Sequence, residues 1–130
     1  EGPTLQELAD AGVQIVAPPM WVLLKVNGRG GISPSSYARD AKRAGLDIIT
    51  WTTERSGRII EDVINPGGSF YYLSTWGALH NDGDILRTIH VLAKRVGVLG
   101  IFSDWPATTT FYGNCMLDDG RSGPRHGYGY

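Results

Sequence analysis

Segments with helical periodicity alternate with short apolar runs along this chain, and this alternation constrains the fold more than any other feature. Residues 13–17, 46–52 and 98–102 are apolar runs without helical spacing, as expected for buried strands. The helical segments between them leave room only for short connections. Strands joined in this way form a parallel sheet with right-handed crossovers. The sequence therefore predicts one α/β domain of parallel strands with flanking helices.

Two of the helices have clear start signals. Thr4 and Glu7 stand three residues apart in the capping-box pattern, which predicts a short helix directly after Thr4. Ser33 and Pro34 pair an N-cap residue with a proline at the first helical position. A second helix is therefore expected from Ser33 to Gly45, where the glycine ends it.

The clearest helix follows residues 81–84 and ends at Gly97, with its apolar residues on one face. The Asn-Asp-Gly-Asp sequence at its start resembles half of a calcium loop. The later acidic positions of an EF-hand are missing, which favours a helix cap over a metal site. His80, His90 and His126 have no metal-ligand spacing, and each is expected to be a solvated histidine.

The remaining segments have weaker patterns. Residues 20–26 suit a loop or a short helix, and residues 27–31 suit a flexible turn. Residues 59–64 suit a short helix, and residues 70–73 suit a brief strand or a loop that carries aromatic side chains over the sheet. Residues 117–130 form a polar tail without apolar periodicity, which is expected to be mobile.

Composition excludes several classes of protein. The chain has 130 residues, of which 42% are hydrophobic, so it can bury one core. Its formal net charge of -1 argues against a nucleic-acid partner. Cys115 is the only cysteine, so no internal disulfide forms, and no apolar run reaches the roughly 18 residues of a membrane span. The pattern is that of a soluble chain, compatible with a periplasmic or secreted location.

Three motifs occur in an order and spacing that point to one family. They are Ala17-Pro18-Pro19-Met20-Trp21, the sequence IITWTTERSG at residues 48–57, and the sequence GIFSDWPAT at residues 100–108. Together they resemble the C-terminal part of the glycerophosphodiester phosphodiesterases, over residues 1–116. The resemblance implies the C-terminal portion of a TIM barrel, with about three βα units.

The resemblance also implies a reaction and a cofactor. Enzymes of this family hydrolyse glycerophosphodiesters to glycerol phosphate and an alcohol, using two histidines as general acid and base and a calcium or magnesium ion held by carboxylates. The chain has no His-Arg-Gly motif, no Glu-x-Asp strand and no following His-Asp pair. No catalytic residue and no metal ligand is therefore assigned to it, and the divalent metal is expected only in the complete enzyme.

Trp51 is the main candidate for binding substrate. The residue alone favours an ordinary core tryptophan, but the resemblance implies that its ring lines the pocket and packs on the glycerol part of the substrate. Glu54 and Arg55 are weaker candidates, since Arg55 has the donors to contact a phosphate and the two side chains can equally pair with each other. Asp104 is expected to accept backbone amides at the start of the last helix.

A partial barrel leaves parts of its sheet uncovered. Its sheet has an open edge and an apolar inner face, which need a partner. In one interpretation, a missing N-terminal portion or a second chain completes an enzyme acting on a small phosphodiester. In the alternative, the chain is a noncatalytic part-barrel that self-associates and at most binds a small ligand.

Overall fold

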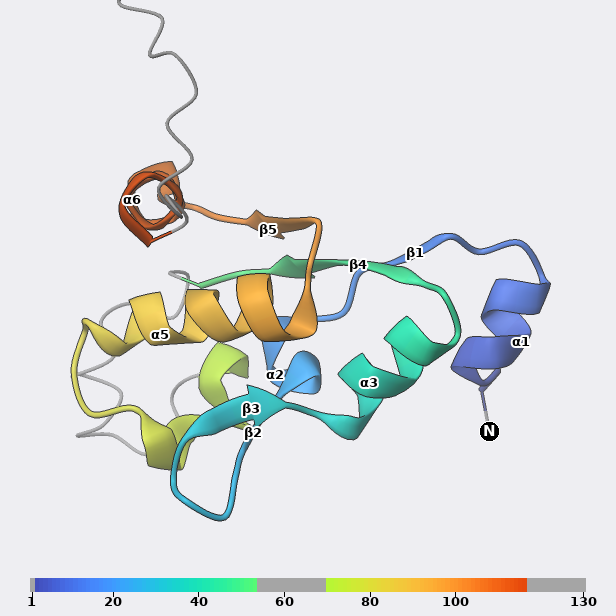
Figure 1. Cartoon of the computed structure of the whole chain (residues 1–130), viewed down its shortest axis with the longest axis horizontal. Helices are drawn as coiled ribbons and strands as arrows, with labels where there is room; N and C mark the ends of the chain where they lie inside the picture. The colour runs from blue at the N-terminus through green and yellow to red at the C-terminus, as the bar shows by residue number, and fades with distance from the viewer. Residues whose placement is uncertain (1, 54–69, 117–130) are drawn as a thin grey trace, which may run out of the picture.

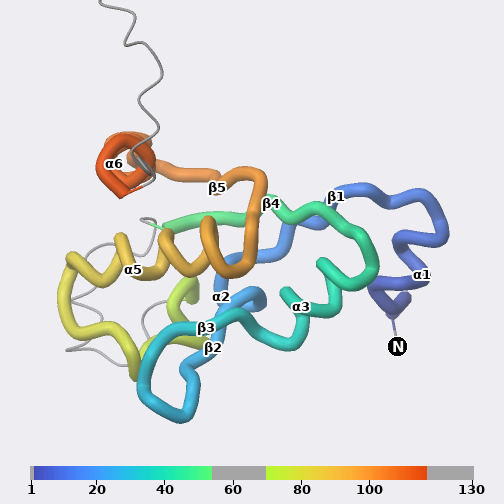
Figure 2. The backbone as a smooth tube through the Cα atoms, viewed as in Figure 1, coloured from blue at the N-terminus to red at the C-terminus, as the bar shows by residue number. Residues whose placement is uncertain are grey.

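The computed structural model describes residues 2–53 and 70–116, and Figures 1 and 2 trace the path of the chain. Glu54, Arg55, the helix predicted at residues 59–64, His126 and the polar tail at residues 117–130 lie outside the described residues.

Helices and strands alternate along the described chain. In order, the elements are α1 (Leu5–Asp10), β1 (Ile15–Val16), α2 (Met20–Leu23), β2 (Leu24–Val26), β3 (Ile32–Pro34), α3 (Ser36–Arg43), β4 (Asp47–Trp51), the 3-10 turns η1 (Phe70–Tyr72) and η2 (Trp76–Ala78), α5 (Asp84–His90), its π-helical continuation η3 (Val91–Val96), β5 (Gly100–Phe102) and α6 (Pro106–Met116).

Three of the strands form a parallel sheet in the order β1-β4-β5, as the sequence predicts. Each strand is shorter than its apolar run. The register aligns Val16 with Ile48, and Trp51 with Phe102. Figure 1 shows α2, α3 and α5 on the same side of β4, with α6 beyond β5. α2, α3 and α5 therefore lie on one side of this sheet.

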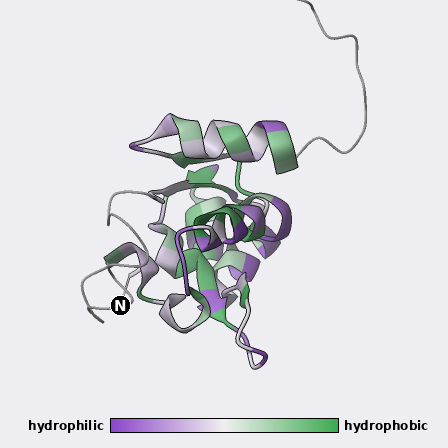
Figure 3. Ribbon diagram, turned by 90° about the vertical axis from the view of Figure 1, so that its left-hand side faces the viewer, coloured by the Kyte–Doolittle hydropathy of each residue, from purple (hydrophilic) through white to green (hydrophobic). Residues whose placement is uncertain are grey.

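The core lies between that face and the helices. Ile48 and Thr50 alternate along β4 and are fully buried there. They meet a cluster that includes Met20, Leu23 and Leu92, each with no exposed surface. Each aliphatic side chain of this kind contributes about 1.5 to 3 kcal/mol when buried. Figure 3 shows hydrophobic residues in the sheet and in the helix segments next to it.

The predicted start of α1 is confirmed. The backbone N–H of Glu7 donates to Oγ1 of Thr4 over 3.2 Å, and the backbone N–H of Thr4 donates to Oε2 of Glu7 over 2.7 Å. Both bonds satisfy amides that have no partner within the helix.

The predicted start of α3 is wrong. Ser33 and Pro34 belong to β3, which pairs in an antiparallel hairpin with β2, so that Pro34 stands opposite Leu24. The helix is capped instead by Ser35, whose Oγ accepts the backbone N–H of Ala38 over 3.2 Å. Pro34 fits the end of a short strand, where no amide donor is required.

The hairpin was not predicted, although the turn that connects its two strands was. The turn expected at residues 27–31 connects β2 to β3, closed by the N–H of Asn27 donating to the carbonyl of Gly31 over 2.8 Å. Residues 70–73, expected to be a brief strand or a loop, hold the 3-10 turn η1, so only the strand alternative is wrong. The helix after residues 81–84 is α-helical only to His90 and continues as the π-helical η3 up to Gly97.

Candidate functional site

The carboxyl end of β4 is tied to the loop that follows β1. The indole N–H of Trp51 donates to the carbonyl of Ala17 over 2.8 Å, and the Thr50 hydroxyl donates to the carbonyl of Pro18 over 2.8 Å. Pro19 forms an isolated parallel bridge with Trp51. These contacts bring the first two motifs of the sequence together at one edge of the sheet.

Four aromatic side chains gather at this edge, and we refer to Trp21, Trp51, Phe70 and Tyr71 as the aromatic cluster. The ring of Trp51 is stacked on Phe70 at 6.5 Å between centroids and meets Tyr71 edge-on at 5.9 Å. Trp21 meets Phe70 edge-on at 5.7 Å. Trp51 is half-buried, and Phe70 keeps 48% of its surface exposed. The cluster is therefore a partly open aromatic wall.

Buried polar atoms lie in the residues next to this wall. Within residues 2–53 and 70–116, the hydroxyls of Thr52 and Thr53 and the indole nitrogen of Trp21 have no hydrogen-bond partner. Leaving such a group unpaired costs about 1 to 3 kcal/mol. The backbone around them is held from η1, because the Tyr72 hydroxyl donates to the carbonyl of Thr53. The carboxyl end of the sheet thus combines an aromatic wall with buried polar groups that make no hydrogen bond within the described residues.

The sheet face opposite the helices is apolar and partly open. Ile15 is 49% exposed and Phe102 is 62% exposed. Ile49 pairs with Gly100 in the register, and a hollow of about 170 Å³ lies over Ile49, Gly100, Ile101 and Phe102. Gly100 has no side chain to fill this space. An apolar sheet face of this kind is normally covered by another layer.

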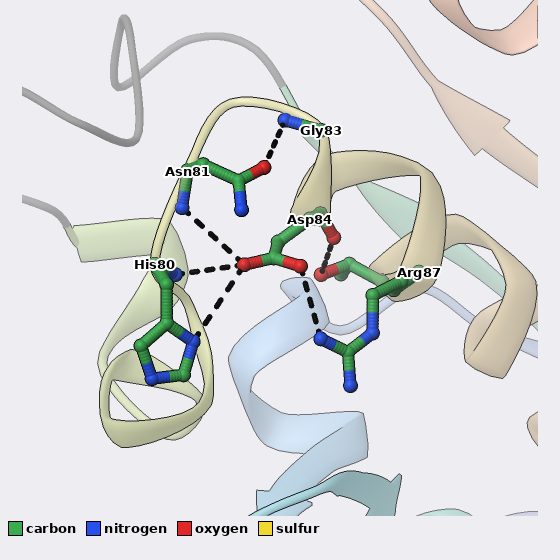
Figure 4. Close-up of polar contacts among 6 residues, drawn as sticks. His80, Asn81, Gly83, Asp84 and Arg87 are labelled. Atoms are coloured by element: carbon green, nitrogen blue, oxygen red, sulfur yellow. Dashed lines mark hydrogen bonds and ion pairs between the residues drawn. The ribbon is translucent and has the colours of Figure 1, made fainter.

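The helix cap predicted from the Asn-Asp-Gly-Asp sequence is wrong, because the N-cap residue of α5 is Gly83 and makes no side-chain capping bond. The segment before α5 is instead held to the Asp84 side chain (Figure 4). Oδ2 of Asp84 accepts the backbone N–H of His80 over 2.7 Å and that of Asn81 over 3.3 Å, while Oδ1 pairs with Arg87 at 3.0 Å. Burial of Asp84 raises the pKa of its carboxyl, but the amides of His80 and Asn81 together with Arg87 outweigh it, so the pKa is lowered.

The other candidates from the sequence play local roles or lie apart from the aromatic cluster. Asp104 is exposed, and within the described structure its carboxylate accepts no amide from the first turn of α6, so the predicted cap is wrong. Nδ1 of His90 is 3.1 Å from the Tyr112 hydroxyl, which links α5 to α6. Across residues 2–53 and 70–116, no three His, Cys, Asp or Glu side chains are grouped to hold a metal.

Sequence reasoning found Trp51 but not its neighbours. Trp21 stands in the first motif, and Phe70 and Tyr71 stand in the segment expected to carry aromatics over the sheet. The spacing of these residues in the sequence does not indicate that they contact Trp51, because they are far from it in the chain. The only feature of the sequence that could have indicated these contacts is the aromatic residues in both segments.

A protein of known sequence is similar to most of this chain. It is named "Extracellular protein", comes from Arthroderma benhamiae, and is 46% identical over 113 residues, or 87% of this chain. The match covers 45% of that protein, so the chain spans less than half of its relative's length. No family model and no solved structure matches the chain. None of the described helices is long and apolar enough to cross a membrane.

Proposed function

We propose that this chain is the C-terminal part of a TIM barrel of the glycerophosphodiester phosphodiesterase type, and that it supplies strands on the substrate side of the site. The observation that carries the proposal is the aromatic cluster at the carboxyl end of a parallel sheet. Active sites of such barrels form at this end of the strands. The three motifs behind the resemblance supply Trp21, Trp51 and the end of β5.

The order of the strands supports a barrel. In β1-β4-β5 the spatial order follows the chain order, and right-handed crossovers then place every connecting helix on the same face. A doubly wound sheet instead reverses its order and has helices on both faces. In a barrel, the uncovered face is buried by further strands of the same sheet. The exposed side chains of Ile15 and Phe102 fit that arrangement.

The length of the relative also supports a barrel. Because the matched 113 residues are 45% of that protein, it contains about 250 residues. A complete TIM barrel typically has about 250 residues. Three parallel strands with their helices would then be completed by a second portion of similar size.

Trp51 binds through its ring face in this proposal. Its N–H is already bonded to the carbonyl of Ala17, so the indole has no donor left for a ligand. An aromatic wall of this type packs on the C–H bonds of a glycerol unit. The ion expected for the complete enzyme, calcium or magnesium, would polarise the phosphate, but the described residues do not fit a metal site. The acid, the base and the metal ligands are therefore assigned to the missing strands.

The test is to complete the barrel. The chain is joined to the part of the Arthroderma benhamiae relative that lies outside the match, and hydrolysis of glycerophosphocholine is measured with calcium or magnesium. We expect turnover from the joined protein, loss of turnover when a chelator removes the metal, and none from the 130-residue chain alone. A joined protein that folds cooperatively but does not hydrolyse the substrate would reject the proposal.

The alternative is a noncatalytic part-barrel that covers its open face with a second copy. The observation that favours it is the apolar surface around Phe102 and Gly100. The two functions differ in one result, because only the enzyme gains activity when the missing strands are supplied.

A further inference from the structure

A hollow on the helix side of the molecule is surrounded by positive charge. It has a volume of about 490 Å³ and lies between the end of β3, the outer face of α3 and the last turn of η3. The residues that line it are Pro34, Ala38, Arg39, Lys42, Arg95 and Val96. None of these residues belongs to the aromatic cluster or to the open face of the sheet. We refer to this hollow as the basic hollow.

Two guanidinium groups at the hollow are held by backbone carbonyls of β3. Nη1 of Arg39 donates to the carbonyl of Pro34 over 3.0 Å, and Nη1 of Arg95 donates to the carbonyl of Ile32 over 3.3 Å. Each guanidinium has further N–H groups available. Neither arginine has a carboxylate partner in the part of the chain that the structure describes. Holding each side chain by one bond reduces the entropy lost when a ligand binds.

The third cation is only weakly neutralised. Nζ of Lys42 lies 3.6 Å from Oδ1 of Asp47, and their side chains are 36% and 53% exposed. An exposed pair of this kind contributes about 0 to 1 kcal/mol and is easily exchanged. The three cations and one carboxylate give the basic hollow a local positive charge in a chain whose formal net charge is -1. A recessed cluster of one sign attracts ions of the other sign.

We propose that the basic hollow binds a small phosphate monoester. Guanidinium groups match a tetrahedral oxyanion with paired N–H donors, and a lysine adds a point charge. Pro34, Ala38 and Val96 provide an apolar floor for the organic part of such a molecule. The volume lies within the range of small-molecule sites. This site is separate from the proposed phosphodiester site and does not depend on it.

The test is a titration of the 130-residue chain with inorganic phosphate and with phenyl phosphate, followed by amide NMR shifts. Every residue that lines the hollow belongs to this chain, so the missing strands are not needed. We expect shifts confined to α3, β3 and η3, with phenyl phosphate binding more tightly than phosphate. Arg39→Gln and Arg95→Gln should each weaken binding about tenfold.

Arg43→Gln is the matched control. Arg43 is on the same helix and is also exposed, but it pairs with Asp40 at 2.6 Å and does not line the hollow. This variant should bind as the wild type does. Arg39→Lys keeps the charge and should restore only part of the affinity, because the paired donors are lost.

Several results would overturn the proposal. Equal weakening by Arg43→Gln would show that the anion responds only to overall charge. Shifts scattered over the surface, or binding only to vesicles of anionic phospholipid, would exclude a site for a small phosphate ester. The same titration on the chain joined to its missing strands gives a second measurement, and no binding by either protein would reject the site.

Discussion

Trp51 shows how one bond decides what a side chain offers to a ligand. The N–H is bonded to the carbonyl of Ala17, and one ring face is stacked on Phe70, so in the proposed enzyme a substrate would meet a ring rather than a donor. A fully buried tryptophan would have no such surface, but Trp51 is half-buried.

Trp51→Ala should therefore reduce the activity of the completed enzyme more than its stability. If the ring contact contributes about 1.5 to 3 kcal/mol, kcat/KM should fall about ten- to a hundredfold. The measurement is kcat/KM and Tm, with Trp105→Ala as the control, because Trp105 is 64% exposed and outside the aromatic cluster. Unchanged kinetics with a large drop in Tm would show that Trp51 is only a packing residue.

Asp84 makes stability depend on pH. Its folded pKa is lowered, because the amides of His80 and Asn81 and the Arg87 guanidinium outweigh the effect of burial. Its contribution is therefore fully present above the unfolded pKa of about 3.9 and is lost as the pH falls through the folded value.

Asp84→Asn should destabilise the protein by about 1 to 3 kcal/mol at pH 7, because the amide group cannot accept from both the backbone and Arg87. The difference from the wild type should shrink as the pH falls below about 3.9. Urea unfolding between pH 2.5 and 7 measures this, with the exposed Asp10→Asn as the control. A difference that stays constant over this range would contradict the role of the charge.

At the scale of helices and strands, short sequence motifs predicted those helix ends that depend on bonds between nearby residues. The capping box of α1 and the glycines that follow α3 and η3 behave as expected, with Gly45 and Gly97 at φ of 77° and 73°. The hairpin of β2 and β3 was missed because Ser33-Pro34 has the same residue types as a helix start. Pairing with β2 overrides that signal, and pairing partners are not visible in a local sequence.

Two serines therefore give a direct test of the corrected boundary. Ser35→Ala removes the cap of Ala38 and the 2.6 Å bond from the Ser35 hydroxyl to the carbonyl of Val22, and should cost about 1 to 2 kcal/mol. Ser33→Ala removes a buried hydroxyl that has no partner among the described residues, and should be neutral or slightly stabilising. Chemical denaturation of both variants measures the difference. The opposite ranking would favour the helix start at Ser33.

At the scale of the whole molecule, the parallel direction of the strands was predictable because a strand-helix-strand unit implies a parallel crossover. The site was predictable only in part. Trp51 is the last residue of β4, but its contacts with Phe70 and Tyr71 depend on where η1 lies at the carboxyl end of the sheet. The apolar open face is likewise visible only once the strands are paired.

That face predicts the behaviour of the isolated chain. The 14.1 kDa chain should sediment as a larger species, because Ile15 and Phe102 leave apolar area uncovered. Phe102→Asp should shift the distribution towards monomer, whereas Phe111→Asp, on α6, should do so less. Sedimentation velocity at several concentrations measures this. A compact wild-type monomer with a cooperative melt would indicate a domain that needs no partner.

The π-helical η3 determines how its last residues are rotated around the helix axis. The N–H groups of Gly97 and Val98 both donate to the carbonyl of Leu92, five and six residues earlier, over 3.0 and 3.1 Å. A π-turn corresponds to an α-helix with one inserted residue, and each residue of an α-helix turns the chain by about 100°. Removing one residue here would rotate Arg95 away from the carbonyl of Ile32. Loss of a single residue from η3 is therefore expected to remove Arg95 from the basic hollow, while Arg39 and Lys42 on α3 stay in place.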